Sequence, residues 1–223
     1  MRLLNLSLVL LLCAICSTSC KKKTNTITKT VIDSIFVTPT SYPDYMVLKP
    51  GNYWVYQTYE VYGADSAFPI IAAPDSFYVE KDSVIGINTY HKLVKNLQSG
   101  QQIYFLRDSL SYTVTNYGAI LFSSQDFTTV FRTIPYINPP AGVPDTILLT
   151  YQMGFRDSLT TVPIGVFPTC TFRQIYHFIP AIPMGEYDYK YARNIGLISQ
   201  TNSIYSFPGS LRFEDRLIRF HVE

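Results

Sequence analysis

Residues 53–62 read Tyr-Trp-Val-Tyr-Gln-Thr-Tyr-Glu-Val-Tyr, a run of aromatic and β-branched side chains. Such residues favour extended backbone, and the preceding Lys-Pro-Gly-Asn at 49–52 is typical of a turn, so a strand is predicted here. Neighbouring side chains of a strand point to opposite faces, and both faces of this strand are therefore apolar. It needs cover on both sides, as in a sandwich, a closed barrel or a curved sheet with a lined interior.

Similar runs recur along the chain at a spacing of about ten residues, with turn signals between them. The further predicted strands are 76–81, 89–94, 102–107, 110–115, 119–123, 128–133, 146–152, 166–178, 186–192, 196–205 and 210–222. No segment has a sustained helical spacing of apolar residues, although one short helix fits near 123–127. The sequence therefore predicts an all-β protein with an antiparallel curved sheet, either barrel-like or a sandwich.

The composition excludes two classes of protein. The chain is 47% hydrophobic and 15% charged, and its 18 Lys and Arg against 16 Asp and Glu give a net charge of +2. This charge is too small for a nucleic-acid binder held by bulk positive charge, and the hydrophobic fraction is too high for an acidic disordered chain. We therefore predict no nucleic-acid partner.

The first twenty residues have the layout of an export signal. Arg2 precedes the almost wholly apolar stretch Leu3–Ile15, and the small residues Ser-Thr-Ser at 17–19 lead to Cys20. Positive charge, a short apolar stretch and small residues before the cut are typical of a secretory signal peptide, and the stretch is too short to span a bilayer. We predict a signal peptide over 1–19.

Cys20 is the predicted site of lipid attachment. The bond before it suits an ordinary signal peptidase and equally a lipoprotein signal peptidase, although Ser17 stands where Leu is usual. Removal of the signal leaves Cys20 and Cys170, so either Cys20 carries acyl chains such as palmitate or the two form a disulfide. We favour acylation, with Cys170 a small buried side chain. Lys21–Lys23 then face anionic lipid headgroups.

Two regions follow the signal. Residues 20–47 are rich in Thr, Ser and Pro and are predicted to form a lipidated tether, with a short strand at 24–30 as the alternative. Residues 48–223 are predicted to form a single antiparallel β domain. The proline-rich loop at 134–144 leaves open a split into two lobes near residue 140.

Four stretches resemble, in this order, a large group of small Bacteroidota lipoproteins without assigned activity. They are LKPGNYWVY at 48–56, DSVIGINTY at 82–90, VPIGVFPTC at 162–170 and YARNIGLI at 191–198. The stretch Ser-Cys-Lys-Lys at 19–22, which spans the predicted cut, is similar to the lipobox frequent in the same group. The resemblance spans most of residues 45–200 and implies an antiparallel β body on a lipid tether. It implies no catalytic residue.

The same resemblance bears on the form of the sheet and on location. Some members of the group are similar to the half-barrel of periplasmic lipoprotein carriers, which is an analogy of fold alone. In Bacteroidota lipoproteins, acidic residues just after the lipidated cysteine accompany transport to the cell surface. None occurs here before Asp33. The resemblance thus implies an outer-membrane lipoprotein that faces the periplasm.

Asp is followed by Ser or Thr seven times among its 11 occurrences, against roughly two expected from composition. Such pairs favour turns and the starts of strands. Where a small or aliphatic residue follows, the pattern also resembles the O-glycosylation signal of exported Bacteroidota proteins. The candidate sites are Ser34, Ser66, Ser83, Ser109, Thr146 and Ser158.

No established catalytic motif is present. The three histidines, at 91, 177 and 221, occur in no metal-ligand spacing, and neither a phosphate-binding glycine loop nor a nucleophile elbow is found. We predict no metal and no cofactor. The carboxylate candidates for a hydrolase are Glu186 with Asp188, and Glu214 with Asp215.

The chain holds 18 Tyr, 14 Phe and 1 Trp. Most are expected in the core and in cross-strand pairs, while a ligand surface over Tyr53, Trp54, Tyr56 and Tyr59 is the functional interpretation. We predict a non-catalytic binding or structural module of the envelope, for a hydrophobic ligand, a glycan or a protein partner. The alternative is a carboxylate-dependent envelope hydrolase.

Overall fold

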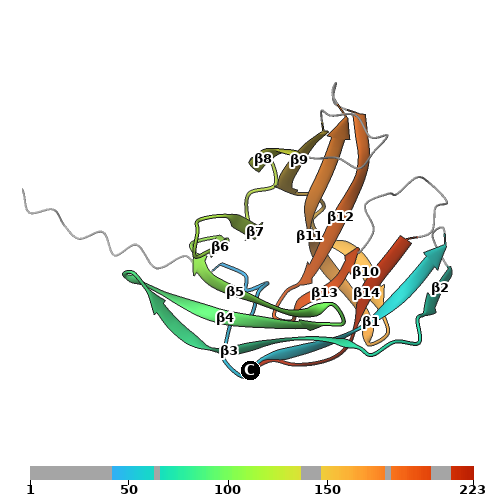
Figure 1. The fold of residues 1–223 in the computed structure, drawn as a ribbon, viewed down its shortest axis with the longest axis horizontal. Coiled ribbons are helices and arrows are strands. Elements are labelled where there is room, and N and C mark those ends of the chain that lie inside the picture. Colours follow the sequence, from blue (N-terminus) through green and yellow to red (C-terminus); the bar gives the residue numbers. More distant parts are fainter. Residues whose placement is uncertain (1–41, 63–65, 137–146, 179–181, 202–211) are drawn as a thin grey trace, which may run out of the picture. The chain divides into compact units, whose positions relative to one another are not determined.

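In the computed structural model every strand belongs to one sheet, and all pairings within it are antiparallel (Figure 1). The structure describes residues 42–62, 66–136, 147–178, 182–201 and 212–223, which belong to one compact unit, Ser41–Glu223. The strands are β1 Tyr53–Tyr62, β2 Ser66–Pro69, β3 Asp75–Ile85, β4 Asn88–Leu97, β5 Gly100–Ser109, β6 Tyr112–Thr115, β7 Ile120–Ser123, β8 Val130–Tyr136, β9 Ile147–Met153, β10 Ser158–Val162, β11 Gly165–Phe178, β12 Ile182–Ala192, β13 Gly196–Thr201 and β14 Arg212–His221. These residues include no helix, and so none that could cross a membrane. The all-β prediction is confirmed.

The first and last strands of the body pair near the middle of the sheet. The strand order is β7-β6-β5-β4-β3-β1-β14-β13-β12-β11-β9-β8, with β2 against β1 and β10 against β11. Strand β1 (cyan in Figure 1) pairs with β3 on one side and with β14 (red) on the other. Two meanders therefore extend in opposite directions from the β1–β14 pair.

The sheet curves until its two ends approach each other. The ring centroids of Phe122 in β7 and Tyr191 in β12 lie 4.9 Å apart, and the Ser123 N–H points at the Met153 sulfur of β9, 3.3 Å away. No ladder joins the two end strands, β7 and β8. The sheet is therefore an almost closed barrel. Of the two predicted architectures, the barrel-like sheet is confirmed and the sandwich is wrong.

Strand β1 coincides with the predicted strand 53–62, and its alternation places Trp54 and Tyr56 on the same face. Trp54 and Tyr56 are 3% and 1% exposed. The Trp54 indole N–H donates to the Ile195 carbonyl at 2.5 Å, and the Tyr56 hydroxyl donates to the Leu197 carbonyl at 2.7 Å. These bonds fix β1 to the start of β13, 141 residues further along the chain.

Gly196 makes the approach of Trp54 to this carbonyl possible. Its φ is +104°, a region that side chains disfavour, and a Cβ there would lie 3.0 Å from the indole nitrogen. Gly196 opens β13 next to a register shift in the β12–β13 ladder. Gly196 is thus a glycine at the start of a strand, beside a bulge.

The body begins before residue 48. The Asp44 carboxylate accepts the N–H groups of Met46 and Val47, and the Asp44 carbonyl accepts the N–H of Asn194. Val47 and Leu48 belong to the buried core. Residues 44–47, which we assigned to the tether, thus pack with the β sheet.

Three further details differ from the sequence prediction. Strands β2 and β10 were not predicted, because they are only four and five residues long. The helix considered near 123–127 is wrong, since the Ser123 hydroxyl accepts the N–H groups of Gln125 and Asp126 and forms a turn. The predicted division near 140 lies outside the described residues.

Replacement of Gly196 by alanine is expected to lower the free energy of unfolding by about 2–3 kcal/mol, because the new Cβ meets both strain and Trp54. Gly118→Ala is the matched control. Its φ is +86° but no heavy atom lies within 4 Å of its Cβ position, so only the conformational cost of about 1 kcal/mol is expected. Urea unfolding measures both, and equal losses would show that the Trp54 contact is unimportant.

Candidate functional site

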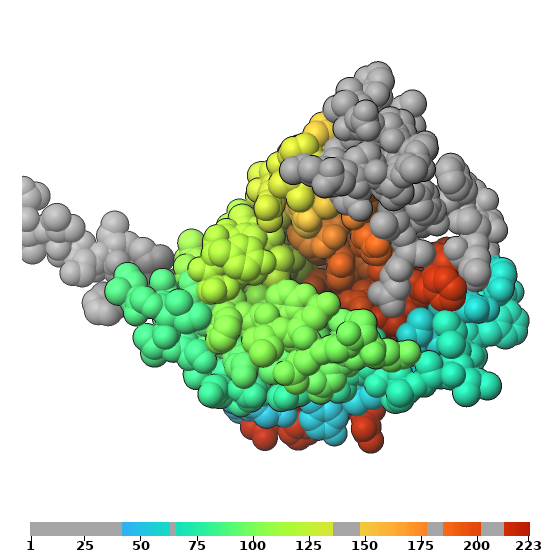
Figure 2. All heavy atoms as spheres, viewed as in Figure 1, coloured from blue at the N-terminus to red at the C-terminus, as the bar shows by residue number. Residues whose placement is uncertain are grey.

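A pocket of about 130 Å³ lies on the concave side of the sheet. In Figure 2 this side is hollowed between the strands β4 and β5 (green) and the strands β11 and β12 (orange). The lining residues are mostly apolar or aromatic: Met46, Leu48, Trp54, Tyr56, Phe77, Leu93, Lys95, Tyr104, Leu106, Leu121, Phe172, Gln174, Tyr189, Tyr191 and Leu197. They come from eight strands and from the segment that precedes β1, so the pocket exists only in the folded barrel.

The two-residue period of the strands brings these side chains to one face. On β11 and β12 the pocket residues are Phe172, Gln174, Tyr189 and Tyr191, which occupy alternate positions. Phe172 is opposite Tyr189 in the ladder, with ring centroids 6.0 Å apart. The Gln174 amide donates to the Tyr189 hydroxyl at 3.4 Å. The wall formed by β11 and β12 is therefore aromatic with one amide.

Lys95 of β4 is the charged side chain of this lining. Its ammonium lies 4.4 Å from the ring centroid of Phe77 and 5.2 Å from that of Tyr104, so it contacts the faces of two aromatic rings. Within the described part of the chain, no carboxylate lies within ion-pair distance of it. The pocket thus holds a cation whose partners are aromatic faces.

Burial lowers the pKa of Lys95 to about 8, and the negative charge of Asp215 opposes this shift only in part. Asp215 is 1% exposed and already accepts hydrogen bonds from Thr58 Oγ1 at 2.7 Å and from Gln200 Nε2 at 2.8 Å. Its charge is therefore stabilised by two donors of its own. Lys95 remains protonated for the most part at neutral pH, in a site that disfavours the charge.

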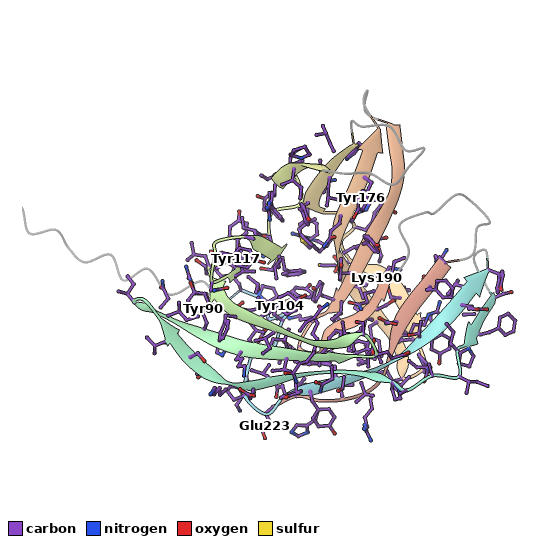
Figure 3. All side chains as sticks on the ribbon, in the orientation of Figure 1. Tyr90, Tyr104, Tyr117, Tyr176, Lys190 and Glu223 are labelled. Atoms are coloured by element: carbon purple, nitrogen blue, oxygen red, sulfur yellow. The ribbon has the colours of Figure 1, made fainter. Side chains whose placement is uncertain are left out.

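The phenols of the pocket stay neutral. Burial raises the pKa values of Tyr56, Tyr104, Tyr189 and Tyr191 above that of an ordinary tyrosine. Figure 3 shows Tyr104 on the inner side of β5, whereas Glu223 lies on the outer side of the sheet. At neutral pH the pocket lining carries a single positive charge among neutral hydroxyl groups.

The predicted aromatic surface divides between the two faces of β1. Trp54 and Tyr56 line the pocket. Tyr53 is 36% exposed and stacks on His221, while Tyr59 lies under the guanidinium of Arg216, 5.3 Å from its ring centroid. The structure therefore brings two of the four predicted residues to the site. Lys95 was missed, because the predicted strand 89–94 ended one residue before it.

The carboxylate candidates do not converge on this pocket. Glu186 and Asp188 both contact Arg173, which alternates with the pocket residues of β11 and so lies on the other face. Glu214 contacts Arg212 and Arg216, whereas its neighbour Asp215 bonds to Thr58 and Gln200. All four lie within strands, and each has partners that hold it in place.

The remaining predicted sites are scattered. Ser66 is exposed at the start of β2, and Ser83, Ser109 and Ser158 are partly buried in strands. Cys170 is buried in the core. Cys20, Ser34 and Thr146 lie outside the described residues. Across the described ranges no three His, Cys, Asp or Glu side chains gather as metal ligands would.

A second hollow, of about 240 Å³, lies between residues 42–46 and strands β5 to β7. Asp44 and Asp108 both line it, and both already accept hydrogen bonds, Asp44 from backbone N–H groups and Asp108 from Thr113 at 2.9 Å. Burial and the charge of Asp44 raise the pKa of Asp108. This hollow carries acidic and polar groups, in contrast with the pocket around Lys95.

The chain matches no family model, and no curated protein matches it. Two solved structures align with most of its length. One is the crystal structure of a presumed lipoprotein from Parabacteroides distasonis, with a TM-score of 0.46 and 12% identity over 81% of this chain and 100% of that one. Another is a presumed exported protein with a YmcC-like fold from Bacteroides fragilis, with a TM-score of 0.44 and 12% identity over 80% and 99%.

Lys95→Met is expected to raise the free energy of unfolding at pH 7 by about 3 kcal/mol, because the fold holds the charged amine at a pKa below its ordinary value. Below pH 8 the Lys95 amine is protonated in both the folded and the unfolded chain, so the folded state bears the full free-energy cost of the charged amine. Between about pH 8 and 10.5 the folded chain loses the proton first, and the gain from the substitution falls by about half by pH 9.5.

Urea unfolding at pH 7 and at pH 9.5 measures this difference, and Lys81→Met, at an exposed position of β3, is the matched control. A Lys95→Met variant that is less stable than the wild type at both pH values would contradict the assignment of Lys95 as a partly buried, destabilising cation.

Proposed function

We propose that this chain is an exported, lipid-anchored envelope protein whose β body binds an apolar group of a ligand in the pocket around Lys95. The observation that carries the proposal is the pocket itself, which combines an apolar and aromatic lining with a few polar groups. Ligand sites are commonly concave, mostly apolar and provided with a small number of placed polar groups. No arrangement of side chains in the described residues favours the hydrolase alternative over this one.

The volume limits the size of the group that enters. An engineered apolar cavity of about 150 Å³ takes up benzene, so a pocket of about 130 Å³ admits one ring or an alkyl segment of about six carbons. Several complete acyl chains do not fit in this space. The proposal is therefore a receptor for the apolar end of a ligand and not a carrier that encloses a whole lipid.

The anchoring part of the proposal is supported by the sequence before the β body. The signal-like stretch 1–19, Cys20 and the three lysines that follow it fit a chain held at the periplasmic face of an outer membrane. The Thr- and Ser-rich stretch after them supplies the spacing from the membrane. A binding module on such a tether meets its ligand in the periplasm.

Trp54 provides a direct test, because it is the chain's single tryptophan and it lines the pocket. Hexan-1-ol is expected to change the fluorescence of Trp54 in a saturable manner. Leu121→Phe fills the pocket from β7 and is expected to raise the dissociation constant at least fivefold, a loss of about 1 kcal/mol.

Val166→Phe is the control for this test, since Val166 is 57% exposed on β11 and does not line the pocket. Unchanged fluorescence at saturating hexan-1-ol, or equal binding by the wild type and by Leu121→Phe, would reject the pocket as the binding site.

Cys20→Ala is expected to remove the membrane anchor. In the native host the wild-type chain should partition with detergent and carry acyl mass on the peptide that begins at Cys20, because acyl chains contribute about 0.8 kcal/mol per buried methylene. The variant should be released in soluble form, and intact-mass measurement follows both. A wild-type chain without acyl mass, or with Cys20 in a disulfide to Cys170, would contradict the anchor.

A further inference from the structure

We propose that the ligand of this pocket is a monocarboxylate, whose alkyl or aryl group of about six carbons enters the apolar lining while its carboxylate pairs with Lys95. This inference rests on the proposed function and adds the chemical class of the ligand. Four features of the molecule support it: the surroundings of Lys95, its effect on the fold, the number of charges in the pocket, and the groups that titrate there.

The first feature is the set of partners of Lys95. Its ammonium lies over the rings of Phe77 and Tyr104, which attract the charge but do not supply the hydrogen-bond acceptors that an ammonium requires. Asp215 is the buried carboxylate whose charge acts on Lys95, but it accepts hydrogen bonds from Thr58 and Gln200 instead. Lys95 therefore has three donors and, within the described residues, no anion to receive them. An anion that enters the pocket completes the site.

The second feature is the effect of Lys95 on the free protein. Burial disfavours its charged form, so the side chain weakens the fold in the absence of a ligand. A structural role in this position, between Phe77 and Tyr104, would be filled as well by an apolar side chain such as Met. A carboxylate that pairs with the ammonium removes the penalty. Binding energy and recognition then arise from the same residue.

The third feature is the number of charges. The lining residues supply one cation, with neutral hydroxyl groups on Tyr104, Tyr189 and Tyr191. One ammonium neutralises one negative charge. A phosphate monoester would leave a second charge without a partner in an apolar site, which is unfavourable. A carboxylate matches both the charge and the limited volume.

The fourth feature is pH dependence. The groups that face Lys95 are Tyr56 from β1, Tyr104 from β5, Tyr189 and Tyr191 from β12, and Asp215 from β14. Burial raises the pKa values of all four phenols, so none of them loses its proton near pH 8. Loss of the Lys95 proton therefore governs carboxylate binding. Affinity should be constant to about pH 7 and then fall by up to tenfold per pH unit above about 8.

The test compares hexanoate, hexan-1-ol and hexyl phosphate, with Trp54 fluorescence as the readout. The protein is the full chain with Cys20→Ala, so that acyl chains on the anchor do not take up the probes. Hexanoate is expected to bind the chain at pH 7 at least tenfold more tightly than hexan-1-ol, and more tightly than hexyl phosphate. Its advantage over the alcohol should decrease between pH 7 and pH 9.5.

Lys95→Met should remove the advantage of hexanoate over hexan-1-ol, and near-UV circular dichroism shows that the variant is folded. Lys81→Met, at an exposed position of β3, should bind all three probes as the wild type does. Equal binding of hexanoate and hexan-1-ol by the wild type, or tighter binding of hexyl phosphate, would overturn the monocarboxylate and leave the apolar pocket in place. Failure of all three probes to bind would instead overturn the proposed function itself.

Discussion

Trp54 and Tyr56 each place a hydrogen-bond donor in an apolar interior, and the rest of the structure depends on how these two donors find acceptors. Both side chains are almost fully buried, and each donates to a backbone carbonyl at the start of β13, 141 residues away in the chain. A buried donor without a partner would cost about 1–3 kcal/mol, so these two bonds restrict how β1 and β13 can approach. Together with the β1–β14 ladder they hold the curved sheet around one interior, and the pocket is the part of that interior that side chains leave unfilled.

Lys95 gives this interior its chemical character. The rest of the lining would suit any small apolar group, and the aromatic rings around it recognise shape more than charge. A single ammonium in such surroundings adds a strong preference for an anionic ligand, because a charge without a partner is unfavourable in an apolar site. The same reasoning explains why the outer carboxylates are poor candidates for chemistry: Glu186, Asp188 and Glu214 already have arginine partners.

The sequence predicted the fold class and the strand β1 well, since β1 is apolar on both faces and follows a clear turn. It also identified Trp54 and Tyr56, but it grouped them with Tyr53 and Tyr59, which the strand alternation and the curvature of the sheet place on the outer face. Lys95 could not be identified, because one lysine after a predicted strand is ordinary. Lys95 becomes a candidate binding residue only because the fold brings β4 together with β12 and β14 around one pocket. The local sequence around Lys95 does not show which distant strands will lie near it.

We propose that a ligand binds between the two walls of the barrel, beside Lys95. The most direct measurement is a set of intermolecular NOEs between hexanoate and the isotopically labelled chain. We predict contacts from the hexanoate methylenes to the ring protons of Phe77 and Tyr104 and to the side-chain methylenes of Lys95. Saturable binding whose NOEs run instead to outer-face residues such as Tyr53 and Tyr59 would contradict it.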